Sequence, residues 1–331
     1  MYTDEDLEQA SQHGVLSEQS VQQFRQFINE QQHQLRQDQE NFRLIAGFND
    51  IFVVIACALL LSSVGWLTQY SGSFLGALAF SALSWGLAEF FVRRRNMALP
   101  AIGLLLSYLG GLIAAPLLFV NDPHPEVFAL SGLLAALGGW LHWRRFRVPI
   151  TVAAAYAACV LAVLGLVMSQ WLIVHSWVEE MIFVGGLVAF SLAMYWDASD
   201  KARVTRRSDV AFWLHLLAAP MLVHPLFAAL GILDGGADFS SMLVVMAVYL
   251  LLALVSIIID RRALMVSSLG YVLYALSSLF DTYGMVELNF ALTGICLGSA
   301  LLLLSAFWHQ VRELVMRAIP TPVHTYLPGL N

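Results

Sequence analysis

Long apolar runs separated by short polar stretches make up most of the chain from residue 50 onward. Each run has roughly the 20 residues that an α-helix needs to cross the hydrocarbon core of a bilayer. The pattern predicts an all-α, polytopic membrane helix bundle of about ten transmembrane helices, arranged as five hairpins. The expected spans are residues 50–69, 74–92, 97–120, 127–143, 148–168, 179–196, 209–232, 240–259, 263–280 and 286–308.

Basic and acidic residues alternate between the connections of these spans. All 17 Lys and Arg residues fall in the N-terminal segment, in connections after even-numbered spans, or in the C-terminal tail. The connections after odd-numbered spans carry Asp and Glu instead. Because Lys and Arg near the ends of spans are retained on the cytoplasmic side, both termini are expected to be cytoplasmic. A one-helix error would place basic clusters on both sides, so the charge pattern supports the number of spans.

The two ends of the chain are polar. Residues 1–48 predict a cytosolic helical segment, with a short helix that ends at Gly14 and a second helix that begins at Ser17. The second helix has apolar residues at a 3.5-residue spacing. It can fold back on the first helix, lie against the membrane, or mediate self-association or docking of a protein partner. Residues 49–308 form the predicted bundle, and 309–331 form a cytoplasmic amphipathic tail.

Composition narrows the class of protein further. With 59% hydrophobic and 12% charged residues, the chain is too apolar for a soluble fold, and the lipid bilayer is its expected partner. A net charge of -6, with the basic residues at helix ends, argues against nucleic acid as a partner. The three cysteines lie in separate apolar runs without the spacing of a zinc site or a disulfide framework. No cofactor is expected.

A pattern near the N-terminus resembles that of a known group of proteins. Leu7, Ala10, Gly14, Ser17 and Val21 outline a short helix, a glycine turn and a serine-capped helix ahead of many spans. This layout resembles a family of uncharacterised bacterial multi-pass inner-membrane proteins with an N-terminal helical domain of unknown function. The resemblance covers residues 1–65 and the general arrangement. It implies a bacterial inner (cytoplasmic) membrane and brings no activity or ligand.

Ionisable groups inside a membrane are candidates for function because burying them is costly. Glu89 lies one helical turn before Arg93, and an i,i+4 ion pair at the membrane interface accounts for it. His215 is deeper in its span. It can be a neutral histidine bonded to a neighbouring helix, or a gating or substrate contact. The spans show no Asp, Arg or Lys deep in the bundle, which argues against ion-coupled transport.

The ninth span has a polar stripe on one face. Its hydroxyl groups can line a cleft for a neutral or amphipathic ligand, or can join neighbouring helices by hydrogen bonds. The residues of the stripe are Ser267, Tyr271, Tyr274 and Ser278.

The seventh span contains Pro220 and Pro225, with His224 beside them. Prolines inside a helix remove backbone donors, so they predict a kink that faces protein or a cavity. We therefore expect a pocket between the seventh and ninth spans, in which Tyr271 or Tyr274 lies with His215 or with this kink.

These observations predict a membrane protein that binds or transports a neutral or lipid-like molecule, or a membrane scaffold that acts through its N-terminal helices. The alternative is a membrane-embedded metalloenzyme at the outer face, where imidazole and carboxylate groups gather. Their spacing is irregular, so acidic loops placed by topology explain them better. We assign no metal ligand and no catalytic residue and favour a non-enzymatic protein. The outer-face residues are His124, Glu126, His175, Glu179, Glu180 and His224.

Overall fold

A computed structural model describes the helical body of the protein. The described residues are part of 13–24, then 48–262 with gaps at 72–73, 121, 172–175, 201–204 and 230–238, then scattered positions from 265 to 307, and 308–317. Helices and no strands are present among them. The helices are α3 (Phe48–Ser71), α4 (Phe74–Ala88), η1 (Glu89–Arg94), α5 (Ala98–Phe119), α6 (Pro125–Phe146), α7 (Ile150–Gln170), α8 (Val178–Ala198), α9 (Arg206–Ala229), α10 (Phe239–Ile259) and α13 (Trp308–Arg317).

The helices confirm an all-α membrane protein. Six of those described are long and apolar enough to cross a bilayer: α3, α4 with η1, α5, α7, α8 and α9. Adding α6 and α10, the helices coincide in position with the first eight expected spans. The expected spans 263–280 and 286–308 fall largely outside the described residues, so a total of ten remains a prediction. Many large apolar side chains on the outer surfaces are exposed, as they are when lipid surrounds them.

Proline and serine fix several helix boundaries. Pro125 occupies the first turn of α6, where its missing N–H costs no hydrogen bond. Near the N-terminus, the hydroxyl of Ser17 accepts a hydrogen bond from the Ser20 N–H at 3.1 Å. This contact confirms the predicted cap of the second N-terminal helix, of which residues 19–24 are described as helical. The remainder of the predicted 1–48 segment, including its role in association, lies outside the described residues.

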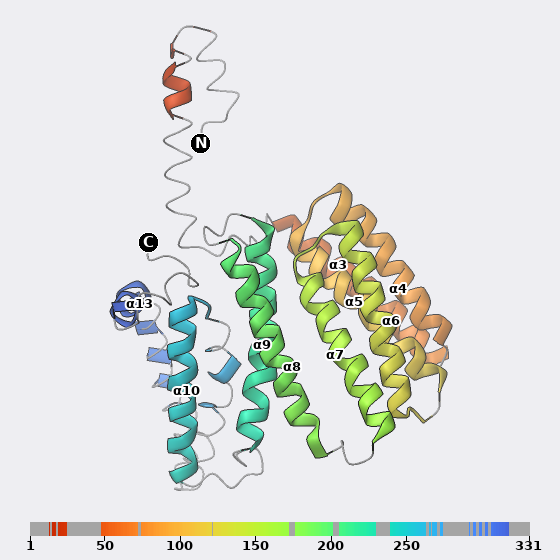
Figure 1. The fold of residues 1–331 in the computed structure, drawn as a ribbon. Coiled ribbons are helices and arrows are strands. Elements are labelled where there is room, and N and C mark those ends of the chain that lie inside the picture. Colours follow the sequence, from red (N-terminus) through yellow and green to blue (C-terminus); the bar gives the residue numbers. More distant parts are fainter. Residues whose placement is uncertain are drawn as a thin grey trace.

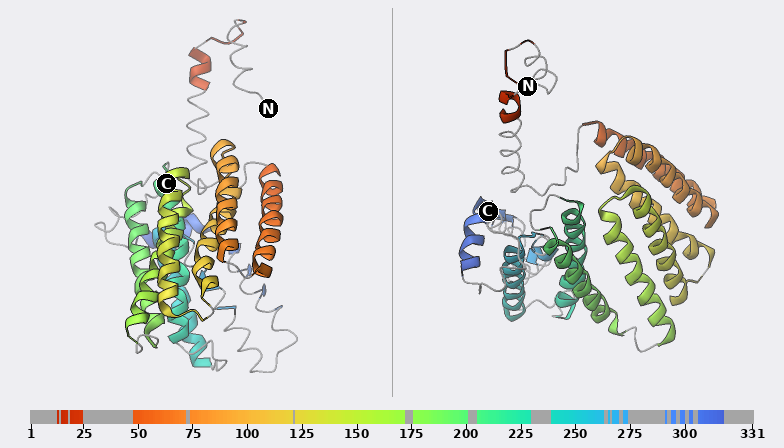
Figure 2. Two further views of the ribbon diagram at one scale, coloured as in Figure 1. Left: turned by 90° about the vertical axis from the view of Figure 1, so that its right-hand side faces the viewer. Right: turned by 45° about the horizontal axis from the view of Figure 1, so that its top comes forward.

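The helices form two groups, α3 to α7 and α8 to α10 with α13, which meet where α7 packs against α9. Figure 1 shows α3 to α7 on one side, α8 and α9 in the middle, and α10 and α13 on the other side. The right-hand view in Figure 2 shows the same order. Among the described residues, the basic stretches 93–95, 144–147 and 206–207 lie at one end of the bundle, and the acidic stretches 122–126 and 179–180 lie at the other. We call these the basic end and the acidic end.

The closest helix pairs differ from the predicted hairpins. The predicted hairpins turn at acidic connections, but α4 with α5, α6 with α7 and α8 with α9 pack most extensively, and each of these pairs is joined at the basic end. By contrast, α7 and α8 touch little. Glycine explains the preference, because Gly132, Gly165 and Gly186 lie directly against the backbone of the facing helix.

Helix α13 covers the beginning of the expected amphipathic tail. Its buried residues Trp308 and Met316 pack with residues of α10, so protein covers part of its apolar face. The Trp308 indole N–H donates to Asp260 Oδ1 at 2.9 Å. The guanidinium of Arg262 lies over the same indole ring, 4.7 Å from its centroid. Helix α13 is therefore docked on the end of α10.

Candidate functional site

Helix α9 is at the centre of the candidate site because one of its sides contacts buried charges and the other lines a cavity. It is the most extensively buried of the six candidate spans. One side carries Ser208 and His215 toward α8 and the end of α10. The other side carries Trp213, Leu216 and Pro220 toward a cavity. The first side forms a network of buried charges, and the second forms a binding space.

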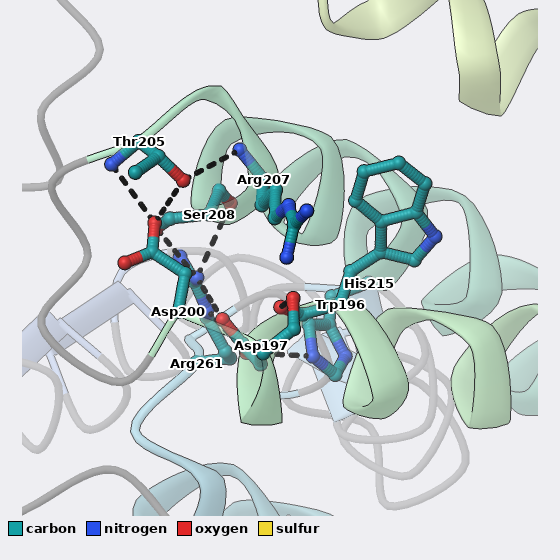
Figure 3. Close-up of polar contacts among 9 residues, drawn as sticks. Trp196, Asp197, Asp200, Thr205, Arg207, Ser208, His215 and Arg261 are labelled. Carbon is teal, nitrogen blue, oxygen red and sulfur yellow. Dashed lines mark hydrogen bonds and ion pairs between the residues drawn. The ribbon is translucent and has the colours of Figure 1, made fainter.

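The buried charges are Asp197 and Arg261. Asp197 lies in the last turn of α8, and Arg261 follows α10. Arg261 Nε donates to Asp197 Oδ2 at 3.0 Å, and Nη2 donates to Oδ1 at 2.5 Å. Their side chains are only 2% and 3% exposed, so little water competes with this two-point contact. Figure 3 shows the two side chains facing each other.

His215 completes the network. Its Nε2 lies 3.1 Å from Asp197 Oδ2, and the ring has no exposed surface. The edge of its ring also meets the ring of Phe190 on α8, at 5.4 Å between centroids. Arg261 donates further to the hydroxyl of Ser208, at 3.3 Å. Donors from α9 and from the end of α10 thus surround one carboxylate of α8.

Neighbouring contacts fix the connection from α8 to α9. Asp200 Oδ2 accepts hydrogen bonds from the backbone N–H of Thr205 at 2.8 Å and from its hydroxyl at 2.6 Å. The Thr205 hydroxyl in turn accepts the Arg207 N–H at 3.3 Å, which caps the start of α9. The hydroxyl of Ser256 donates to the carbonyl of Arg261. Asp197, Ser208, His215 and Arg261 thus form a buried, hydrogen-bonded ion pair that joins α8, α9 and the end of α10 at the basic end. We call this group the clamp.

The clamp adds a feature that the sequence analysis did not anticipate. Arg261 was expected only to mark topology as a loop charge, and Asp197, one residue beyond the expected span 179–196, was assigned no role. The structure buries both at the basic end, whereas the prediction concerned charges deep in the spans. The sequence did contain a signal for this ion pair. Asp197 and Arg261 follow expected spans that end on the same side of the membrane, where opposite charges can pair.

A cavity of about 520 Å³ lies on the other side of α9, between α5, α6 and α7. Its volume is within the range of small-molecule sites. Alanines of α7 make the space, because side chains this small leave room between the helices. The lining residues are Leu106, Leu109, Gly110, Ile113, Ala135, Ile150, Ala153, Ala154, Ala157, Ala158, Leu161, Trp213, Leu216, Leu217 and Pro220.

The predicted ligand-binding residues have separate locations. Pro220 lines the cavity, whereas His215 belongs to the clamp. Ser267 is half-buried, and Tyr271, Tyr274 and Ser278 lie outside the described residues. The seventh expected span therefore does line a cavity, but its described partners are the third, fourth and fifth spans. A contribution from the ninth span remains a prediction.

The described outer-face histidines and carboxylates lie at the acidic end. His224 Nε2 is 3.6 Å from Glu179 Oε1, and both side chains are more than 40% exposed. His124 and Glu126 are exposed, and His175 lies outside the described residues. Among the residues that the structure describes, no three His, Cys, Asp or Glu side chains converge where they could hold a metal ion.

Sequence reasoning also missed a second buried histidine. His142 on α6 has no exposed surface, and its Nδ1 lies 3.1 Å from the Thr151 hydroxyl of α7. The rings of Trp85, Tyr108 and Phe146 surround it, at 4.5–6.0 Å between centroids. His142 therefore joins α4, α5, α6 and α7 near the basic end.

Comparison with known proteins adds no function to these observations. No family model matches the chain, and neither a curated protein nor a solved structure matches it. The function has to be argued from the clamp and the cavity.

Proposed function

We propose that this membrane protein binds the acyl chain of a lipid-like molecule in the cavity between α5, α6, α7 and α9. The observation that carries the proposal is the lining, which consists of aliphatic side chains, glycine, proline and one indole. A space of this kind excludes ions and polar solutes, because nothing in it replaces their hydration. An acyl chain loses no hydrogen bonds on entering it.

The position of the cavity supports the same ligand. Leu109 and Ile113 lie in the middle of α5, at the depth of the hydrocarbon core if α5 spans the bilayer. Leu106 and Leu216 line the cavity and are also exposed, so the space connects with the outer surface of the bundle. Lipid surrounds that surface at this depth. A chain can therefore enter sideways from the bilayer.

Pro220 adds one polar feature to the wall. A proline has no N–H, so it removes the donor that would normally bond the carbonyl four residues earlier, at Leu216. Leu216 itself lines the cavity. Its carbonyl can accept a hydrogen bond from a hydroxyl group of the ligand, which favours a neutral amphiphile over a pure hydrocarbon.

Filling the cavity should abolish binding. Ala157 lines it from α7, whereas Cys159 on the same helix is exposed. We expect Ala157→Phe to lower photocrosslinking of a diazirine-labelled fatty acid to α7 and α9 peptides at least several-fold, because the new ring occupies the space. Peptide mass spectrometry of the purified full chain measures the crosslinks.

Cys159→Phe is the matched control, since it introduces the same ring on the lipid-facing side of α7. It should leave crosslinking of the cavity peptides unchanged. Equal labelling of the cavity peptides in both variants would show that the probe reports the outer surface alone, and the binding proposal would fail.

We also propose that the basic end faces the cytoplasm, that both termini lie there, and that the protein belongs to a bacterial inner membrane as the resemblance implies. The gathering of arginines at one end of the bundle supports this orientation.

With the native cysteines replaced by alanine, Asp122→Cys at the acidic end should react with a membrane-impermeant maleimide added to whole cells. Asn96→Cys at the basic end should react only after the membrane is opened. The reverse pattern would overturn the orientation.

A further inference from the structure

Six arginines gather where η1 and α6 end. Arg93 and Arg94 lie in the last turn of η1 and Arg95 caps it, whereas Arg144 and Arg145 lie in the last turn of α6 and Arg147 caps that helix. All six are exposed. The ends of η1 and α6 are held together by an ion pair between Glu89 and Arg145. We call this group the arginine cluster.

Glu89 neutralises only part of the cluster. It accepts hydrogen bonds from Arg145 Nε at 2.6 Å and Nη2 at 3.1 Å, and a longer one from Arg93 at 3.4 Å. The other four arginines make no ion pair with any described carboxylate. Since the whole chain carries a net charge of -6, the excess of positive charge here is a local feature.

Aromatic rings hold two of these free arginines at the membrane surface. The guanidinium of Arg144 lies 4.9 Å from the centroid of the Trp140 ring, and that of Arg95 lies 5.7 Å from the centroid of Phe90. Both rings are substantially exposed. An exposed Trp near the end of a span marks the level of lipid head groups, and Phe90 lies at the end of the neighbouring span. The two guanidinium groups are thus placed where lipid phosphates lie.

The backbone of the cluster is unusual. Arg147 has a φ of 53°, in the left-handed region that favours glycine, and it closes α6 through its N–H to the carbonyl of Trp143. Residues Glu89–Arg94 form a π-helix, a widened turn that is frequent at functional sites. Glycine can replace arginine at this position without backbone strain.

We propose that the arginine cluster binds the phosphate of an anionic lipid head group. Guanidinium groups contact phosphate oxygens at two points, and four of them without a partner among the described carboxylates provide a site of high positive charge. The aromatic rings select a lipid over a soluble anion, because they hold the site at the membrane surface. This site is separate from the acyl cavity and does not depend on it.

The test uses the full chain in nanodiscs made from equal amounts of phosphatidylglycerol and phosphatidylcholine. Native mass spectrometry then measures which lipids stay bound. The triple variant Arg94→Gln, Arg144→Gln, Arg147→Gly should lower retained phosphatidylglycerol by about fivefold for each arginine that contributes, and leave phosphatidylcholine unchanged. Arg317→Gln is the control, because Arg317 lies on α13 and pairs with Glu313 at 2.7 Å. It should retain as much phosphatidylglycerol as the unaltered protein.

Arg147→Gly alone separates binding from folding. Glycine suits the left-handed backbone, so this variant should keep or raise the thermal stability while it lowers phosphatidylglycerol retention. Unchanged retention in both this variant and the triple variant would overturn the proposal. Displacement of the bound lipid by millimolar inorganic phosphate would overturn it too, since the site would then be one for a soluble anion. Ala157→Phe should not alter head-group retention, which distinguishes this site from the acyl cavity.

Discussion

Replacing Asp197 with alanine is expected to lower the free energy of unfolding by about 3–5 kcal/mol, the usual cost of removing one partner of a buried ion pair. The free energy falls because the substitution leaves the buried partners of Asp197 without their carboxylate. Arg261 is 2% exposed and would keep its charge without a carboxylate, and His215 would lose its contact at Nε2. Reversible unfolding of the purified protein in mixed micelles, followed by circular dichroism, measures the change.

Two further variants locate the origin of this loss. Asp197→Leu combined with Arg261→Met removes both charges and should restore most of the stability, because no uncompensated charge stays buried. Glu89→Ala breaks an ion pair whose partners are 31–53% exposed, so water replaces its contacts and the effect should be far smaller. A loss of equal size in Glu89→Ala and Asp197→Ala would show that the clamp is no stronger than a surface pair.

Gly165→Ala is expected to cost about 1–3 kcal/mol although it adds only one methyl group, because an overpacked helix contact must move apart. A Cβ on Gly165 would lie 2.8 Å from the carbonyl oxygen of Pro125 and 2.9 Å from the Cα of Ala129, both on α6. Backbone atoms cannot turn aside as a side chain can. The α6–α7 pair would therefore have to separate, which the same unfolding measurement detects.

Gly103→Ala is the matched control on α5, since nothing lies within 4 Å of a Cβ built there. Alanine favours a helix over glycine by up to about 1 kcal/mol, so this variant should be neutral or slightly stabilising. If Gly103→Ala and Gly165→Ala change stability in the same direction, close packing of α6 on α7 does not contribute to the stability of the fold.

The positions of the helices that match the first eight expected spans could be predicted from the sequence alone. The thickness of a bilayer sets the length of an apolar run, and each run must satisfy its own backbone hydrogen bonds as a helix. Local contacts were equally readable. The Glu89–Arg93 pair is separated by one helical turn, and the Ser17 cap acts on a residue three positions away. The grouping of the arginines at one end followed from the charge pattern.

The contacts between distant residues were decided by the tertiary structure. Arg145 reaches Glu89 across 56 positions, and Arg261 reaches Asp197 across 64. The cavity likewise combines residues of four helices. In a soluble protein, the apolar face of a helix indicates its packing side, but a helix surrounded by lipid is apolar on every side. Its sequence therefore fixes where it crosses the bilayer, whereas close contact of small residues and the pairing of buried charges decide which neighbour it meets.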